Sequence, residues 1–177
     1  MTMKLAKMVT VALLTLGAMA AHAQMPEPPA ELKAIEWMVG NWEGDVHWTM
    51  QGMDETGKMT WKVEKDTMFI KQSSVIEMMG MKMTEVGFTG WDANKKKYWS
   101  QTFTNYGPTP RTEWGTLEKD KMTFVSDPWD MGMPEGPMTS RSTMTKKSND
   151  EVLFVLEFKM GDTWQKAGEG TFKRKKV

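Results

Sequence analysis

Four methionines occur within the stretch EMMGMKMTE, residues 77–85. Thioether sulfurs are soft ligands that favour Cu(I) or Ag(I), and they have no proton to lose when a metal binds. Met-x-Met spacing occurs in this stretch and a second time in DMGMP, residues 130–134. The sequence therefore offers one set of candidate soft-metal ligands, which comprises Met78, Met81, Met83, Met131 and Met133.

The same side chains also suit an apolar binding surface, because Met is flexible and fills irregular shapes. Aromatic residues would complete such a surface, and Arg141 could pair with a ligand carboxylate. The candidate ligand-binding residues under this hypothesis are Met78, Met81, Met83, Trp129, Met131, Met133, Trp61, Trp99 and Arg141. A third possibility is a protein without a small ligand, with an interaction role or with surface methionines that buffer oxidants.

Residues 1–23 are expected to be a secretory signal peptide. Lys4 and Lys7 precede an apolar run that is too short for a membrane span, and Ala21-His22-Ala23 is an A-x-A cleavage site. No cysteine follows that could carry a lipid anchor. We therefore expect an exported, periplasmic protein without a membrane anchor, composed of a proline-rich lead-in at 24–30 and one domain at 31–177.

The composition of the remaining chain narrows the possible partners. Without the two lysines of the signal peptide, 21 basic residues face 23 acidic ones, a net charge of −2. This balance argues against nucleic acid and against an anionic membrane surface. The same segment keeps 16 of the 20 methionines and has only four leucines. A Leu-to-Met exchange costs little in a core, so methionine content alone does not establish a site.

The candidate residues must be positioned mainly by strands. In ELKAIEWMVG, Leu32, Ile35 and Val39 have helical spacing, with Pro29 before them and Gly40 after them, which predicts a short amphipathic helix. In the rest of the chain, apolar and polar residues alternate in the manner of strands, and these segments are rich in Thr, Val, Phe and Trp. Ten strands are predicted, near 41–50, 58–65, 68–78, 81–91, 97–105, 111–117, 121–126, 138–146, 151–160 and 163–174.

Evenly spaced strands with short connections favour an all-β fold, a single antiparallel up-and-down barrel of about ten strands whose N-terminal helix plugs one end. Connections then alternate between the two ends. Those on the helix side (63–66, 91–97, 117–121 and 146–150) are charged and contain no Met, whereas those opposite (50–59, 78–81, 105–111, 126–138 and 160–162) hold ten methionines. This asymmetry predicts a methionine-rich open end.

The hairpin in EMMGMKMTE is predicted in more detail. A two-residue turn at Met79-Gly80 suits type I′ geometry, because Gly tolerates positive φ. Met78 would then face Met81, and Ile76 would face Met83. Three thioethers would therefore point in one direction at the barrel rim, and a change of one residue in turn length would separate them.

The opening LKAIEWMVGNWEGDVHW resembles that of lipocalin-like (calycin) barrels, with a helix followed by Gly40-Asn41-Trp42 entering the first strand. GFTGWDANKKKYWSQTF and the closing GEGTFKRKK resemble a family of secreted bacterial lipocalin-like proteins of unknown function. This family is distantly similar to the nitrobindins, which are haem-binding barrels. Nitrobindins ligate haem through a histidine near the C-terminus. No histidine follows His47 here, so the resemblance implies the fold and no cofactor.

Enzymatic activity is not expected. The chain contains no G-x-S-x-G, HExxH or phosphate-binding glycine loop. His47 alternates with Glu43 and Asp45 on one face of the first strand, and such a row is usually solvated. Arg174, in the closing KRKKV, is also expected to be solvated. The function predicted from sequence is the binding of a small hydrophobic molecule, with Cu(I) or Ag(I) binding as the alternative.

Overall fold

The computed structural model describes residues 27–50, 52–132, 134 and 136–176. The expected signal peptide and the first residues of the lead-in lie outside these ranges. Ten strands follow a short helical segment: β1 (Gly40–Trp48), β2 (Glu55–Lys65), β3 (Ile70–Met78), β4 (Met81–Asp92), β5 (Lys97–Thr104), β6 (Arg111–Glu118), β7 (Lys121–Ser126), β8 (Ser140–Ser148), β9 (Glu151–Met160) and β10 (Thr163–Arg174). No helix in the described ranges is long and apolar enough to cross a bilayer.

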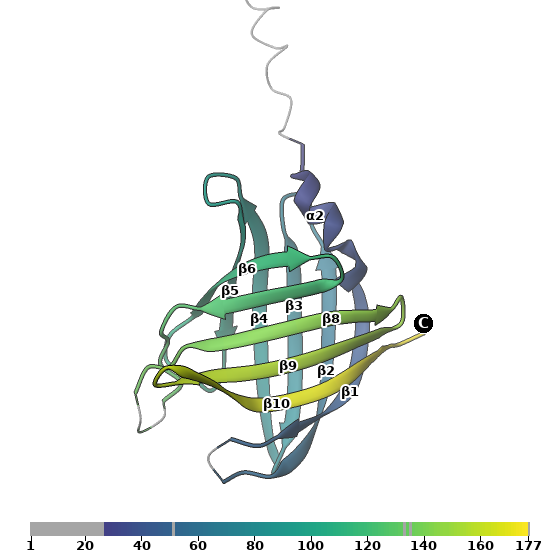
Figure 1. Cartoon of the computed structure of the whole chain (residues 1–177). Coiled ribbons are helices and arrows are strands. Elements are labelled where there is room, and N and C mark those ends of the chain that lie inside the picture. Colours follow the sequence, from purple (N-terminus) through teal and green to yellow (C-terminus); the bar gives the residue numbers. More distant parts are fainter. Residues whose placement is uncertain (1–26, 51, 133, 135, 177) are drawn as a thin grey trace, which may run out of the picture.

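The strands form one closed antiparallel barrel. Each strand pairs with its neighbours in sequence, and β1 pairs with both β2 and β10, which completes the ring (Figure 1). At the seam, Trp42 faces Arg174 and Trp48 faces Gly168. The predicted up-and-down barrel is therefore confirmed, and consecutive connections alternate between its two ends.

Glycine allows the seam strands to approach closely. A Cβ atom on Gly44 would lie 2.3 Å from the Thr171 carbonyl oxygen, and one on Gly170 would lie 2.4 Å from the Asp45 carbonyl oxygen. The register also shifts in β10 between Lys166 and Gly168, a bulge of the kind that bends a barrel strand.

The helical segment covers one end of the barrel, as predicted. It forms α2 (Ala30–Ala34) and a 3-10 turn, η2 (Glu36–Met38), rather than one continuous helix. Ile35 and Met38 are buried. The tighter turn at η2 places the Met38 carbonyl so that the Trp42 indole N–H donates to it at 2.8 Å. The Tyr98 hydroxyl donates to the Glu31 carbonyl at 2.8 Å and ties the helix to β5.

Inward-facing apolar side chains fill the barrel below this helix. Buried residues of β1, β2, β3 and β7 pack with Leu32, Ile35 and Met38 in one cluster, including Trp42, Val46, Val63, Ile70 and Met122. Aromatic contacts continue away from the helix, with ring centroids 6.3 Å apart both between Trp42 and Trp61 and between Trp61 and Phe172. The free space in the lumen lies beyond this packed layer.

Arg174 is not a solvated tail residue, contrary to the expectation from sequence. Its guanidinium donates to the carbonyls of Val39 at 2.5 Å, Trp37 at 3.0 Å and Asn149 at 3.0 Å. It also lies 4.1 Å from the centroid of the Trp42 ring. Arg174 shares the strand face of its cross-strand neighbour Trp42, so its side chain reaches the Trp37 and Val39 carbonyls just before β1 and the Asn149 carbonyl in the β8–β9 turn.

Replacing Arg174 with Lys should lower the free energy of unfolding by about 1–3 kcal/mol, because an ammonium cannot reproduce the planar set of donors or the stacking on Trp42. Urea denaturation followed by tryptophan fluorescence would measure the change. The exposed neighbour Lys173 provides the control, and Lys173→Ala should change stability by less than about 0.5 kcal/mol. Equal effects of the two substitutions would show that Arg174 does not hold the seam.

Candidate ligand-binding cavity

A cavity of about 380 Å³ occupies the lumen between the packed layer and the end opposite the helix. Side chains from all ten strands line it because every second residue of each strand points inward. β1, β2, β9 and β10, which are adjacent in the ring, contribute an apolar wall that includes Trp48, Met59, Trp61, Phe154, Leu156, Phe158, Ala167 and Phe172.

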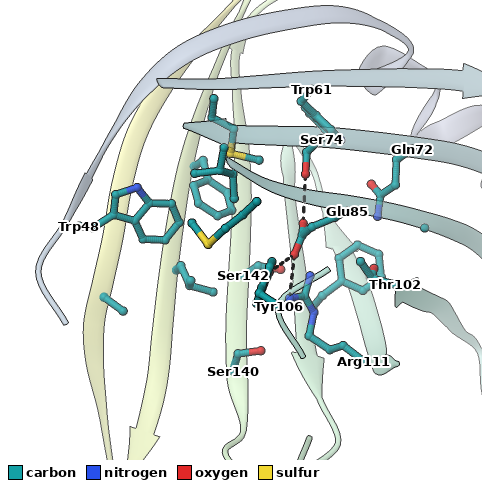
Figure 2. Close-up of a pocket in the computed structure, with 18 of the residues that line it drawn as sticks. Trp48, Trp61, Gln72, Ser74, Glu85, Thr102, Tyr106, Arg111, Ser140 and Ser142 are labelled. Carbon is teal, nitrogen blue, oxygen red and sulfur yellow. Dashed lines mark hydrogen bonds and ion pairs between the residues drawn. The ribbon is translucent and has the colours of Figure 1, made fainter. Parts of the chain in front are cut away.

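A polar wall lies on the adjacent strands β3 to β6. It is composed of Gln72, Ser74, Glu85, Ser100, Thr102, Arg111 and Glu113. Figure 2 labels Gln72, Ser74, Glu85, Thr102 and Arg111 of this wall. The strand register brings these residues together, since Ser74 pairs with Glu85, Ser100 with Glu113 and Thr102 with Arg111. The cavity is therefore amphipathic, with its charged groups concentrated on one side.

Glu85 is held by three donors. The Tyr106 hydroxyl donates a short hydrogen bond to it, Ser74 Oγ donates at 3.2 Å, and Arg111 Nη1 donates at 3.3 Å (Figure 2). Burial, together with the charge of Glu85, raises the pKa of Tyr106 well above its ordinary value, so the phenol stays protonated and remains a donor.

Arg111 lies between two carboxylates. Its Nη1 meets Glu85 and its Nε meets Glu113, each at 3.3 Å. Burial disfavours the guanidinium charge, but the two glutamates outweigh it, so the pKa of Arg111 is raised and the side chain stays charged. The Cζ atom of the guanidinium lies over the Trp129 ring, 5.0 Å from its centroid. Trp129 is fixed there by two backbone hydrogen bonds of 3.0 Å to Met138 across the β7–β8 connection.

Glu113 is the least satisfied charged group of the wall. It is 4% exposed, and its contact with Arg111 Nε is an ion pair without hydrogen-bond geometry. Burial raises the pKa of Glu113; Arg111 opposes this shift and the nearby charge of Glu85 adds to it. The carboxyl therefore holds its proton to a higher pH than a solvated glutamate does.

Two hydroxyls beside these charges have no hydrogen-bond partner within the described part of the chain. They are Ser100 Oγ and Thr102 Oγ1, and both residues are 1% exposed. Gly87 keeps a side chain away from one of them, because a Cβ atom there would lie 2.8 Å from Thr102 Oγ1 and 3.1 Å from Gln72 Nε2. Buried polar groups are normally paired, so two unpaired hydroxyls in residues that line the cavity are unusual.

The chain matches, over residues 27–174, the model of a family described as "Protein of unknown function (DUF1579)". The chain belongs to the DUF1579 family. No curated protein matches it. Among solved structures, it is similar to the crystal structure of Rv2717c from M. tuberculosis, with a TM-score of 0.61 and 10% identity over 85% of this chain and 100% of that one. At this identity the likeness shows the barrel fold alone.

In this DUF1579 barrel, methionines form the rim of the cavity. The β3–β4 turn has the predicted geometry, with φ of 53° at Met79 and 73° at Gly80. Met78 pairs with Met81, and Ile76 with Met83, as expected. Six thioethers from three connections and their strands line the cavity: Met50, Met53, Met78, Met81, Met83 and Met131. They range from 8% exposed at Met78 to 53% at Met81, so the rim reaches from the lumen to solvent.

Most of the residues predicted from the sequence meet at this cavity. Met78, Met81, Met83, Met131, Trp129 and Trp61 all line it, whereas Met133 lies outside the described residues. His47 lies in the row of β1 that was expected to be solvated, and its Nε2 is 3.2 Å from an oxygen of the Asp54 carboxyl, with both side chains exposed.

Two predicted lumen residues are instead on the outer face. Trp99 alternates with the inward residues Tyr98 and Ser100, and its ring covers Gly90. Arg141 lies between the lining residues Ser140 and Ser142, so it also points outward. There it donates to Glu157 at 2.6 and 2.7 Å and stacks 4.4 Å from the Trp164 ring centroid. The sequence interpretation assigned both residues to the wrong strand face.

The sequence interpretation did not identify the polar wall. Arg111 and Glu113 have the i, i+2 spacing of residues on one strand face, and Glu85 and Gly87 have the same spacing on β4. That spacing was the available signal, but it does not distinguish a lumen face from a solvated one.

Glu113→Gln tests the burial of this carboxyl. Because the folded pKa is raised, the stability that Glu113 contributes is complete below its unfolded pKa of about 4.3 and is lost as the pH rises through the folded value. Glutamine cannot lose a proton. The free energy of unfolding of Glu113→Gln minus that of the wild type should therefore increase from about pH 4 upward and level off above the folded pKa.

Urea denaturation at a series of pH values would give this difference. Glu43→Gln is a control of opposite sign, because a hydrogen bond from the Lys175 ammonium lowers the pKa of the exposed Glu43 carboxyl. The free energy of unfolding of Glu43→Gln minus that of the wild type should therefore fall as the pH rises. A flat difference for Glu113→Gln would mean that the carboxyl is solvated.

Proposed function

We propose that this DUF1579 barrel binds a small, mainly apolar molecule in its lumen and admits it at the methionine rim. The observation that carries the proposal is the amphipathic cavity of about 380 Å³. Sites for small molecules typically measure about 300–1,000 Å³ and combine an apolar lining with a few polar groups that fix orientation. The apolar wall and the polar wall have this division.

The fold and the rim support the same proposal. Closed barrels of this size hold single small ligands in their lumen, and the resemblance of the opening residues to lipocalin-like barrels points in the same direction. Thioether side chains adapt to varied shapes, which suits an entrance. The signal peptide expected at residues 1–23 would place this binding activity in the periplasm.

We further propose that the protein acts by binding and not by catalysis. Glu85 already accepts three hydrogen bonds and Arg111 is paired on two sides. Nucleophilic catalysis needs a nucleophile beside a base that is free to take its proton. Among the described residues, Ser100 and Thr102 have no hydrogen bond to a base that would activate them.

Adjacent residues of β8 provide a matched test. Ser142 lines the cavity, and Thr143 is on the opposite strand face. Ser142→Trp should occupy part of the cavity and weaken the binding of an apolar fluorescent probe by at least about tenfold, whereas Thr143→Trp should leave it unchanged.

Fluorescence titration of the purified protein would measure both affinities, and circular dichroism would confirm that the variants are folded. Equal probe binding by the two variants would place the probe outside the lumen. Failure of the wild-type protein to bind any apolar probe would overturn the proposed function.

Soft-metal binding is a second candidate, favoured by the register that sets Met78 opposite Met81 with Met83 two residues farther along. Among the described residues, no group of three His, Cys, Asp or Glu side chains could hold a metal ion, so thioethers would be the ligands.

Changing Met78, Met81 and Met83 together to Leu separates the two candidates. Leucine has nearly the same volume and polarity, so apolar probe affinity should change by less than about threefold. If the rim binds Cu(I), the variant should lose that binding in a titration against a competing chelator. Equal Cu(I) binding by the variant and the wild-type protein would rule out this site.

A further inference from the structure

The charges inside the cavity do not cancel once the Glu113 carboxyl has lost its proton. The lining residues include two acidic side chains, Glu85 and Glu113, and one basic side chain, Arg111. With all three ionised the wall has a formal charge of −1. A ligand carboxylate would add a second excess negative charge in an enclosed apolar space, where such repulsion is poorly screened.

Within the described structure, the lining includes unpartnered N–H donors at Trp48, Trp129 and Arg111 Nε, but the carboxyl of Glu113 keeps unused acceptor capacity. Glu85 has three donors, whereas Glu113 has only the ion pair with Arg111 Nε at 3.3 Å. An ionised carboxylate has about four lone-pair sites. A buried Glu113 carboxylate therefore needs donors that the described side chains do not supply.

Unpartnered hydroxyls lie beside this carboxyl. Ser100 is the cross-strand neighbour of Glu113 on β5, and its Oγ has no partner in the described structure although the residue is 1% exposed. Thr102 Oγ1, next along the same face of β5, also has no hydrogen-bond partner in the described structure. Each hydroxyl oxygen can accept a hydrogen bond, so the three groups together form an acceptor-rich recess in the polar wall.

We infer that this recess selects the polar end of the ligand, and that the ligand is an apolar amine whose ammonium group pairs with Glu113 and donates to the Ser100 and Thr102 hydroxyls. The ammonium would bring the formal charge of the wall to zero and supply three donors. The hydrocarbon part would then extend along the apolar wall toward the methionine rim. This inference rests on the proposed function, since it assigns the head group of the same ligand.

Probes with one hydrocarbon chain and three head groups test it: octylamine, octanol and octanoate. Each would be titrated against the bound apolar fluorescent probe at about pH 8, where the amine is protonated and the carboxylate ionised. Octylamine should displace the probe at a concentration about tenfold below that of octanol, and octanoate should be the weakest competitor. Octanoate competing as well as octylamine, or octanol matching the amine, would overturn the inference.

Substitutions locate the selectivity. Glu113→Gln should abolish the preference for octylamine over octanol and change the octanol affinity by less than about threefold. Glu157→Gln removes the carboxylate of an Arg–Glu pair on the outer face, and it should keep the wild-type preference. Loss of the preference for octylamine over octanol in both variants would show that the recess does not discriminate between head groups.

Ser100→Ala adds a readout that a purely structural role would not give. Removing a buried hydroxyl without a partner should leave the unfolding midpoint of the empty protein unchanged or raise it. The same change should weaken octylamine binding several-fold. A lower midpoint with unchanged amine affinity would assign Ser100 to structure and count against the recess.

The two proposals fail in distinguishable ways. If the fluorescent probe binds the wild-type protein and the three octyl compounds compete equally, the lumen binds apolar molecules without reading a head group, and only this inference fails. If no apolar probe binds, the proposed function fails.

Discussion

Pairing between β1 and β10 is the constraint on which the rest of the structure depends. Once these strands join, no strand edge remains open, and alternate residues of every strand must face one shared lumen. Close approach at Gly44 and Gly170 permits the pairing. The cavity, its two walls and its rim are all consequences of closing the ring with ten strands, because the side chains below the helix fill only part of the enclosed space.

The polar wall works against stability. Burying a carboxyl such as Glu113 with one poorly aligned partner costs free energy, and replacing buried charged groups by apolar ones of similar size is often neutral or stabilising. Ser100 and Thr102 add two hydroxyls that are desolvated by burial and have no hydrogen-bond partner in the described structure. A ligand that compensates these groups would offset their cost, so the proposed binding rests more on the polar wall than on the methionines.

Local patterns were sufficient to predict the strands, the closed topology and the β3–β4 turn. The turn depends on Gly80 and on residues next to it in sequence, so its register could be derived without the rest of the barrel. The orientation of β5 could not. Its apolar side chains Trp99 and Phe103 suggest an inward face, yet they point outward, and Ser100 and Thr102 point into the lumen. The usual hydrophobic pattern reverses where the polar wall passes, and β8 shows the same reversal, with Ser140 and Ser142 inside and Arg141 outside.

The bond from Arg174 to the Val39 carbonyl joins positions 135 residues apart, near the two ends of the barrel sequence. A growing chain can form the hairpins from β1 to β9 in order, but one edge of β1 has no partner until the last strand is available. Closure is therefore the contact with the greatest sequence separation, and such contacts slow folding. Until then the exposed edge is a template for pairing with other chains. Synthesis or transport that delivers the C-terminal strand late leaves this barrel open to aggregation for the longest part of its folding.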